Sequence, residues 1–119
     1  MSVQTKRAYD PPKPEDGYRV LVDRLWPRGI SKDRLRVDAW VPDVAPSDEL
    51  RRWFGHDPNR WPEFRKRYRQ ELGGARQQEA LRDLAERAAT GTLTLVYGAR
   101  DDQHNNAVVV KEVIEEMAG

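Results

Sequence analysis

Two apolar segments with helical sequence between them constrain the fold of this chain more than any other feature. Residues 18–26, YRVLVDRLW, contain three successive apolar residues, and residues 92–99, TLTLVYGA, form the second apolar segment. Successive apolar residues indicate a strand that is covered on both faces. Because helical segments separate the strands, we predict parallel pairing with right-handed crossovers. The sequence therefore predicts an α/β fold, a small layered domain with a short, mostly parallel sheet and helices packed on it.

Capping residues mark two helix starts after the first apolar segment. Ser31 can cap a short helical turn that starts at Lys32. Ser47 can cap a helix whose first turn carries Asp48 and Glu49, and these acids suit the positive end of the helix dipole. Between the two starts, residues 37–41, VDAWV, alternate weakly and predict a short strand or an extended segment.

A stripe of large apolar residues predicts the next helix, and its members are Trp61, Phe64, Tyr68 and Leu72. The start of this helix has two interpretations. Asp57 can be the N-cap with Pro58 as the first helical residue, or Asn59 can be the cap with Pro62 in the tolerant first turn. The glycine pair 73–74 predicts the end.

Two more helices complete the predicted order of elements. Residues 76–89 form one, with an inward side made of Leu81, Leu84, Ala85 and Ala88. Residues 105–119 form the other, with one side made of Ala107, Val110, Ile114 and Met117. Residues 10–17, DPPKPEDG, predict a loop because three prolines and an Asp-Gly pair disfavour regular structure. The predicted order is strand, short helix, possible strand, three helices, strand and helix.

Size and composition exclude several classes of protein. The 119 residues predict a single domain that spans residues 1–119. The absence of cysteine excludes disulfides, thiolate nucleophiles and cysteine-based metal sites. The first twelve residues lack the apolar region of a secretory signal, and no apolar run reaches the ~20 residues of a membrane span, so we expect a cytoplasmic protein without a membrane partner.

The net charge of +1 combines a basic first half with an acidic second half. Residues 1–69 contain 16 Lys and Arg against 11 Asp and Glu, and residues 70–119 contain 5 against 9. A nucleic-acid-binding protein usually has a stronger basic bias overall. The asymmetry is therefore only a weak indication that the first half meets anions.

Two polar loops follow the two predicted strands and locate a candidate site. One is DRLWPRG, residues 23–29, and the other is GARDDQHNN, residues 98–106. In open parallel sheets, ligands bind beyond the carboxyl ends of the strands, near helix N-termini. If the two strands are neighbours, both loops border one crevice.

The side chains of these loops suit a small anionic ligand. The predicted ligand-binding residues are Arg24, Trp26, Arg28, Gly29, Arg100, Asn105 and Asn106. The arginines offer forked donors for phosphate or carboxylate, the tryptophan offers a flat face, and the asparagines lie where a helix N-terminus can bind an anion. His104 is the candidate general acid or base, and Asp101, Asp102 or Asp23 can orient it.

Structural interpretations compete with each of these assignments. Asn105 or Asn106 can be the N-cap of the last helix, Asp101 can belong to a solvated turn, and His104 can be a structural hydrogen-bonding residue. Arg24 and Arg28 can pair with local acids such as Asp23 and Asp33. His56 fits a backbone contact at a helix junction. A metal site at Asp101, Asp102 and His104 is disfavoured because no second histidine or spaced carboxylate supports it.

Two alternative functions rest on other parts of the chain. The basic stretch RKRYRQ, residues 65–70, can contact the phosphates of a nucleic acid or can be a solvated helix face around a buried Tyr68. A regulatory or interaction protein would instead present a patch of exposed aromatic residues, for which Trp40 and Trp61 are candidates.

Four motifs resemble the YeaO-like family, which is domain-of-unknown-function family 488. They are YRVLVDRLWPRG, APSDELRRWFGHDPNRW, RYRQEL and LTLVYGARDDQHNNAVV, and the resemblance covers roughly residues 5–117. It implies a compact α/β domain, offers no established activity to carry over, and leaves any cofactor unknown. The matching hallmark positions are Asp23, Arg24, Trp26, Pro27, Arg28, Gly29, Trp53, Phe54, His56, His104, Asn105 and Asn106. The segment Trp40-Val41-Pro42 departs from the family pattern, in which a lysine is expected.

The leading hypothesis is therefore a pocket for a small anionic molecule, such as a nucleotide or a phosphorylated or carboxylated metabolite. The loops that follow the first central strand and the last strand form this pocket. The sequence leaves open whether the protein is an enzyme.

Overall fold

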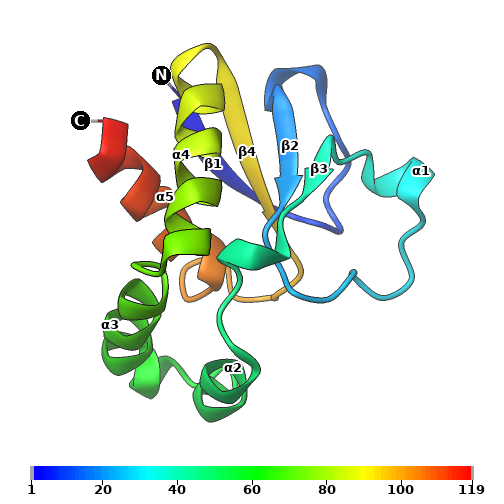
Figure 1. Cartoon of the computed structure of the whole chain (residues 1–119). Helices are drawn as coiled ribbons and strands as arrows, with labels where there is room; N and C mark the ends of the chain where they lie inside the picture. The colour runs from blue at the N-terminus through cyan, green and yellow to red at the C-terminus, as the bar shows by residue number, and fades with distance from the viewer. Residues whose placement is uncertain (1, 119) are drawn as a thin grey trace.

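The computed structural model describes residues 2–118 and has the predicted α/β architecture (Figure 1). Its sheet has the strand order β1-β4-β2-β3, and every neighbouring pair is parallel. The strands are β1 (Ser2–Arg7), β2 (Tyr18–Leu21), β3 (Ala39–Trp40) and β4 (Thr92–Tyr97). The two strands with apolar centres, β2 and β4, are neighbours.

Five helices surround this sheet in the described part of the chain: α1 (Lys32–Leu35), α2 (Asp48–Phe54), α3 (Trp61–Glu71), α4 (Ala75–Ala89) and α5 (Asn106–Ala118). Short 3₁₀ turns lie at Pro14–Asp16, Pro42–Val44 and Pro58–Arg60. Figure 1 shows α4 and α5 alongside the strands, α2 and α3 below the carboxyl ends of the strands, and the small α1 to the right of β3. Leu35 of α1 packs in a separate, smaller apolar cluster with Leu21 and Val96. The helices that cover the two faces of the sheet therefore differ in size, because α1 is much shorter than α4 and α5.

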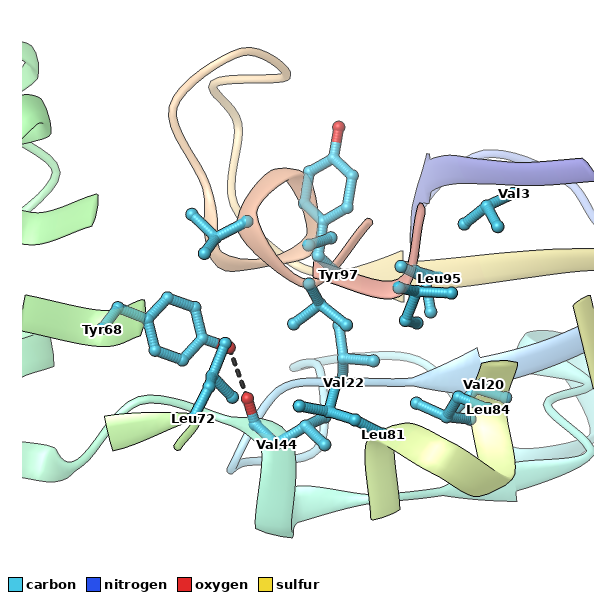
Figure 2. Close-up of a cluster of buried hydrophobic side chains, with 14 of the residues drawn as sticks. Val3, Val20, Val22, Val44, Tyr68, Leu72, Leu81, Leu84, Leu95 and Tyr97 are labelled. Atoms are coloured by element: carbon cyan, nitrogen blue, oxygen red, sulfur yellow. Dashed lines mark hydrogen bonds between the residues drawn. The ribbon is translucent and has the colours of Figure 1, made fainter. Parts of the chain in front are cut away.

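Both faces of β2 are covered, as its continuous apolar sequence predicts. Val20, Leu21 and Val22 have no exposed surface. Val20 and Val22 belong to the larger core, and Leu21 packs in a smaller cluster with Val96 and Leu35 on the opposite face. Figure 2 shows the larger core, in which the Tyr68 hydroxyl donates a hydrogen bond to the Val44 carbonyl.

The predicted serine caps are confirmed. Ser31 Oγ accepts a hydrogen bond from the Arg34 amide at the start of α1, and Ser47 Oγ accepts one from the Leu50 amide at the start of α2. Each donor–acceptor distance is 3.2 Å. The Ser47 hydroxyl also donates to Glu71 at 2.6 Å. The first turn of α2 is thereby bound to the end of α3.

The two interpretations of the start of α3 resolve into a turn followed by a helix. The Asp57 carboxylate accepts from the Asn59 amide at 3.0 Å, so Asp57 caps the 3₁₀ turn Pro58–Arg60. The α-helix then begins at Trp61, and Pro62 lies in its first turn. Asn59 is therefore not the cap.

Three expectations about these elements were wrong or incomplete. The edge strand β1 was not predicted, because its sequence SVQTKR is mostly polar and only Val3 is buried. The first predicted strand is shorter than expected and ends at Leu21. Met117 is 37% exposed although it was placed on the buried side of α5. Ile114, one turn earlier, has no exposed surface, so the last turn of α5 extends beyond the core.

A buried ion network fastens α1 to the sheet. Asp16 is 3% exposed and Arg19 is 4% exposed. One Arg19 amino group lies 2.7 Å from Asp16, and the guanidinium also donates to the carbonyls of Leu35 (2.7 Å) and Arg36 (3.2 Å). Lys6 lies 3.0 Å from the same Asp16 carboxylate. Burial by itself would raise the pKa of Asp16, but the hydrogen bonds to Lys13, Lys6 and Arg19 hold it below its usual value.

Candidate functional site

The loops that follow β2 and β4 border one cavity of about 300 Å³. They meet because β2 and β4 pair directly, with Leu21 opposite Val96 near the carboxyl ends of both strands. Elements α2 and α3 complete the walls. The lining residues are Asp23, Arg24, Leu25, Trp26, Pro27, Arg28, Pro46, Arg51, Phe54, His56, Phe64, Gly98, Ala99, His104, Asn105 and Asn106.

The structure brings seven of the ten predicted site residues to this cavity: Asp23, Arg24, Trp26, Arg28, His104, Asn105 and Asn106. Gly29, Arg100 and Asp101 are not among the lining residues. Gly29 has a φ of +76° and is exposed in the turn beyond Arg28, and Arg100 is exposed. Asp101 reaches the cavity only through its contact with His104.

Asp23 places a half-buried carboxylate in the cavity. Its Oδ2 accepts a hydrogen bond from the Gly98 amide at 2.8 Å. A Cβ atom at Gly98 would lie 3.2 Å from this oxygen, so the missing side chain permits the close approach. Burial raises the pKa of Asp23 above its usual value, although the Gly98 amide, the Asn106 amide and the charge of His56 each lower it. In residues 2–118 no lysine or arginine forms an ion pair with Asp23.

Asp101 shapes the loop after β4. Its Oδ1 accepts from the amides of Gln103 (2.9 Å) and His104 (3.0 Å), and its Oδ2 lies 2.9 Å from Nδ1 of His104. The Gln103 amide and then the His104 side chain lower the pKa of Asp101. If Nδ1 carries the proton that this contact favours, Nε2 is an acceptor. The imidazole also packs edge-on against Trp61, with ring centroids 5.3 Å apart.

The two asparagines make structural hydrogen bonds. Asn105 Oδ1 accepts from the Val108 amide at 3.2 Å, and its amide nitrogen donates to the Asp101 carbonyl at 2.9 Å. The expected N-cap of the last helix is thus Asn105. The Asn106 amide donates to the Val22 carbonyl at 3.0 Å and so connects α5 to the residue that follows β2. Asn106 thus connects the two loops, and Asn105 holds the second loop to the start of α5.

Three arginines line the cavity, and their local partners differ. Arg24 donates to the Pro46 carbonyl at 3.2 and 3.3 Å and lies 3.7 Å from Asp48. Arg51 lies 3.5 Å from the same Asp48 carboxylate. Among residues 2–118, no side-chain hydrogen bond or ion pair engages the guanidinium of Arg28, so the considered pairing with Asp23 or Asp33 does not occur. Two guanidinium groups therefore share one carboxylate, and the third is unpaired.

His56 and Arg51 are cavity residues that the sequence reasoning did not select. His56 was expected to contact backbone at a helix junction, but its imidazole is exposed and lines the cavity. Its φ is +57°, directly after Gly55 with φ +55°. A left-handed residue other than glycine is strained, and such strain is often found at functional sites. The Gly-His pair at the end of α2 was the available signal.

Replacement of His56 tests this strain. His56→Gly is expected to be about 1 kcal/mol more stable than His56→Ala, because alanine keeps the Cβ atom that disfavours the left-handed conformation. Urea denaturation of the two variants measures the difference. Equal stabilities would show that the backbone at this position relaxes without cost.

The basic stretch 65–70 on α3 is largely neutralised by acids. Its three arginines pair with neighbouring carboxylates, namely Arg65 with Glu112 at 2.8 Å, Arg67 with Glu63 at 2.7 Å, and Arg69 with Glu112 at 3.3 Å and with Glu116. Tyr68 is buried beneath them. This arrangement matches the solvated-face interpretation and leaves few cations for the phosphates of a nucleic acid.

The candidate aromatic patch is small. Trp40 is 44% exposed, but its indole donates to the Asp23 carbonyl at 2.8 Å and its ring packs edge-on against Trp26. Trp61 is half-buried and stacks on Phe64. The two tryptophans thus have structural roles beside the cavity.

Residues 2–118 contain neither a cluster of metal-binding side chains nor a membrane-spanning helix. No group of three or more His, Asp or Glu side chains is arranged to hold a metal ion within the described residues. In the same part of the chain, no helix combines the length and apolarity needed to cross a bilayer.

Comparison with known proteins gives one family and several close relatives. The family model described as the inactive DUF488-N3 subclade matches residues 2–118. The uncharacterized protein YeaO of Escherichia coli is 41% identical over 117 residues, which is 98% of this chain and 100% of the relative. The uncharacterized protein Rv3073c of Mycobacterium tuberculosis is 42% identical over 112 residues, which is 94% of this chain and 92% of the relative. No solved structure matches.

Proposed function

Because the chain belongs to the inactive DUF488-N3 subclade, we propose that it binds a small anionic molecule in the cavity between the β2 and β4 loops without catalysing its conversion. A volume of about 300 Å³ lies at the lower end of the range for small-molecule sites. Candidate ligands include nucleotides and phosphorylated or carboxylated metabolites.

The observation that carries this proposal is the unpaired guanidinium of Arg28. Arg24, Arg28, Arg51 and Asp23 line the cavity, and Asp48 pairs with two of the arginines, so one positive charge is in surplus when the histidines are counted as neutral. Forked guanidinium donors match the oxygens of phosphate and carboxylate. The carboxylate of Asp48 already pairs with Arg24 and Arg51, so Arg28 is the arginine whose donors are available to an anionic ligand.

The description of the family favours binding over chemistry. His104 has the geometry of a proton-transfer group, since Asp101 holds Nδ1 and leaves Nε2 available. The same contact equally serves a histidine that donates or accepts a hydrogen bond to a ligand. We therefore assign His104 a binding role in this proposal, with Asp101 orienting its imidazole.

Arg28→Gln is the variant that tests the anion site. It is expected to weaken binding about 10- to 100-fold, because a hydrogen bond to a charged group contributes about 1.5–3 kcal/mol. A panel of nucleotides, sugar phosphates and carboxylates is first tested by thermal shift on the wild type, and hits are measured by calorimetric titration.

Arg100→Gln is the matched control, since it removes the same charge from an exposed position outside the cavity. It should bind each hit as the wild type does. Equal weakening in both variants would indicate a general charge effect and would contradict a site at Arg28. A wild type that binds no anion in the panel would contradict the proposal itself.

A further inference from the structure

The carboxylate of Asp23 accepts a hydrogen bond from the backbone but has no cationic side chain as an ion-pair partner in residues 2–118. It is half-buried, it lines the cavity, and no lysine or arginine of residues 2–118 forms an ion pair with it. A charged group removed from water costs free energy unless it is paired or well hydrogen-bonded. Its pKa is accordingly raised by burial.

The surrounding chain holds this carboxylate in place without neutralising it. The neighbouring Arg24 turns away to the Pro46 carbonyl and Asp48. The Gly98 amide binds Oδ2 at 2.8 Å, and the absence of a side chain at Gly98 makes room for it. The backbone carbonyl of Asp23 is also fixed, because the Trp40 indole donates to it at 2.8 Å.

The cavity therefore contains two groups of opposite charge that lack a full complement of partners. Arg28 lies unpaired in the loop after β2, and Asp23 begins the same loop. Apolar and aromatic side chains, including Trp26, Phe54 and Phe64, form walls of the same cavity. A molecule that fits this arrangement has an acidic group, an amine and a flat or apolar body.

We propose that the cavity takes a small zwitterion whose amine binds the Asp23 carboxylate and whose acidic group binds Arg28, with an aromatic amino acid as the model ligand. This inference rests on the proposed function and adds a requirement to it. Two contacts of opposite charge fix the orientation of a ligand and disfavour anions that lack the amine.

Matched pairs of probes test this requirement. Phenylalanine and 3-phenylpropionate differ only in the amino group, and so do tryptophan and indole-3-propionate. Phosphoethanolamine and ethyl phosphate form a pair with a phosphate in place of the carboxylate. Calorimetric titration of the wild type should give at least one pair in which the zwitterion binds about tenfold tighter or more.

The quantity to compare is the ratio of the dissociation constants of the amine-free probe and its zwitterionic partner. Asp23→Asn should reduce this ratio to about one, while the amine-free probe keeps its affinity within the error of titration. Asp102→Asn is the matched control, since Asp102 is exposed in the second loop and does not line the cavity, and it should keep the wild-type ratio. Thermal melts establish that each variant is folded. The ratio measured on the wild type decides the question even if Asp23→Asn is unstable.

Failure of this inference is distinguishable from failure of the proposed function. If the wild type binds both members of every pair equally, or binds other anions but no zwitterion, the role of Asp23 is overturned and the anion site remains. If it binds neither these probes nor any anion of the panel, both proposals fall.

Discussion

Replacing Arg19 with methionine is expected to lower the free energy of unfolding by about 3–5 kcal/mol, because it removes one partner of a buried ion pair. Arg19 and Asp16 are both almost completely buried, and their charged groups lie 2.7 Å apart. The substitution also removes the donors to the carbonyls of Leu35 and Arg36. A loss of this size is a large fraction of the stability of a small domain. Urea denaturation monitored by circular dichroism measures it.

Arg65→Met is the matched control for this prediction. Arg65 also forms an ion pair, with Glu112 at 2.8 Å, but its side chain is 44% exposed. Exposed pairs contribute about 0–1 kcal/mol, so this variant should unfold close to the wild-type midpoint. If Arg19→Met costs no more than Arg65→Met, the buried network does not stabilise the fold as inferred.

Gly17→Ala is expected to destabilise the protein by about 2–6 kcal/mol, the sum of a conformational and a steric contribution of about 1–3 kcal/mol each. Gly17 has φ +63° and ψ −129°, a combination that residues with a side chain rarely adopt. A Cβ atom there would lie 2.4 Å from the carbonyl oxygen of Thr92. Thr92 is the first residue of β4, so the obstacle is the backbone at the start of a central strand. Thermal and urea unfolding measure the loss.

Gly29→Ala separates the two contributions. Gly29 also has a positive φ, +76°, but a Cβ atom there would meet nothing within 4 Å. Only the conformational cost of about 1–2 kcal/mol should appear. Similar losses at Gly17 and Gly29 would mean that Thr92 moves aside freely, contrary to its place in the sheet.

Helices and strands whose signal comes from residues close together in the sequence were predictable. The serine caps of α1 and α2 act within one helical turn, and both are present. The apolar stripe of α3 and the apolar runs of β2 and β4 also carry their signal locally, as periodicity. Their placement in an α/β fold followed from alternation of strands and helices.

Strand β1 was not predictable in this way, because its pairing is not local. Ser2 lies opposite Thr92, and Arg7 lies opposite Tyr97. The sequence SVQTKR offers a single buried apolar residue, Val3. Its strand conformation is therefore a consequence of backbone pairing with β4 at the edge of the sheet, and edge strands are commonly polar.

The candidate site likewise has features that the sequence predicts and features that depend on the packing of distant segments. The convergence of the β2 and β4 loops follows from the geometry of a parallel sheet, and it could be anticipated. The contribution of Arg51 and His56 depends on how α2 packs beside the sheet, which no local pattern reports. Within the second loop, His104 lines the cavity and the exposed Arg100 does not. A loop has no periodicity from which the direction of its side chains can be predicted.

The central position of β4 has a consequence for folding during synthesis on the ribosome. Both β1 and β2 pair with β4, so neither has that partner until the ribosome has translated residues 92–97. Before that point, the strands described in residues 2–118 can form only the short ladder between β2 and β3. Such long-range pairing slows folding, because a large loop must close first. A nascent chain therefore exposes the apolar centre of β2 to chaperones and to other chains until β4 has emerged.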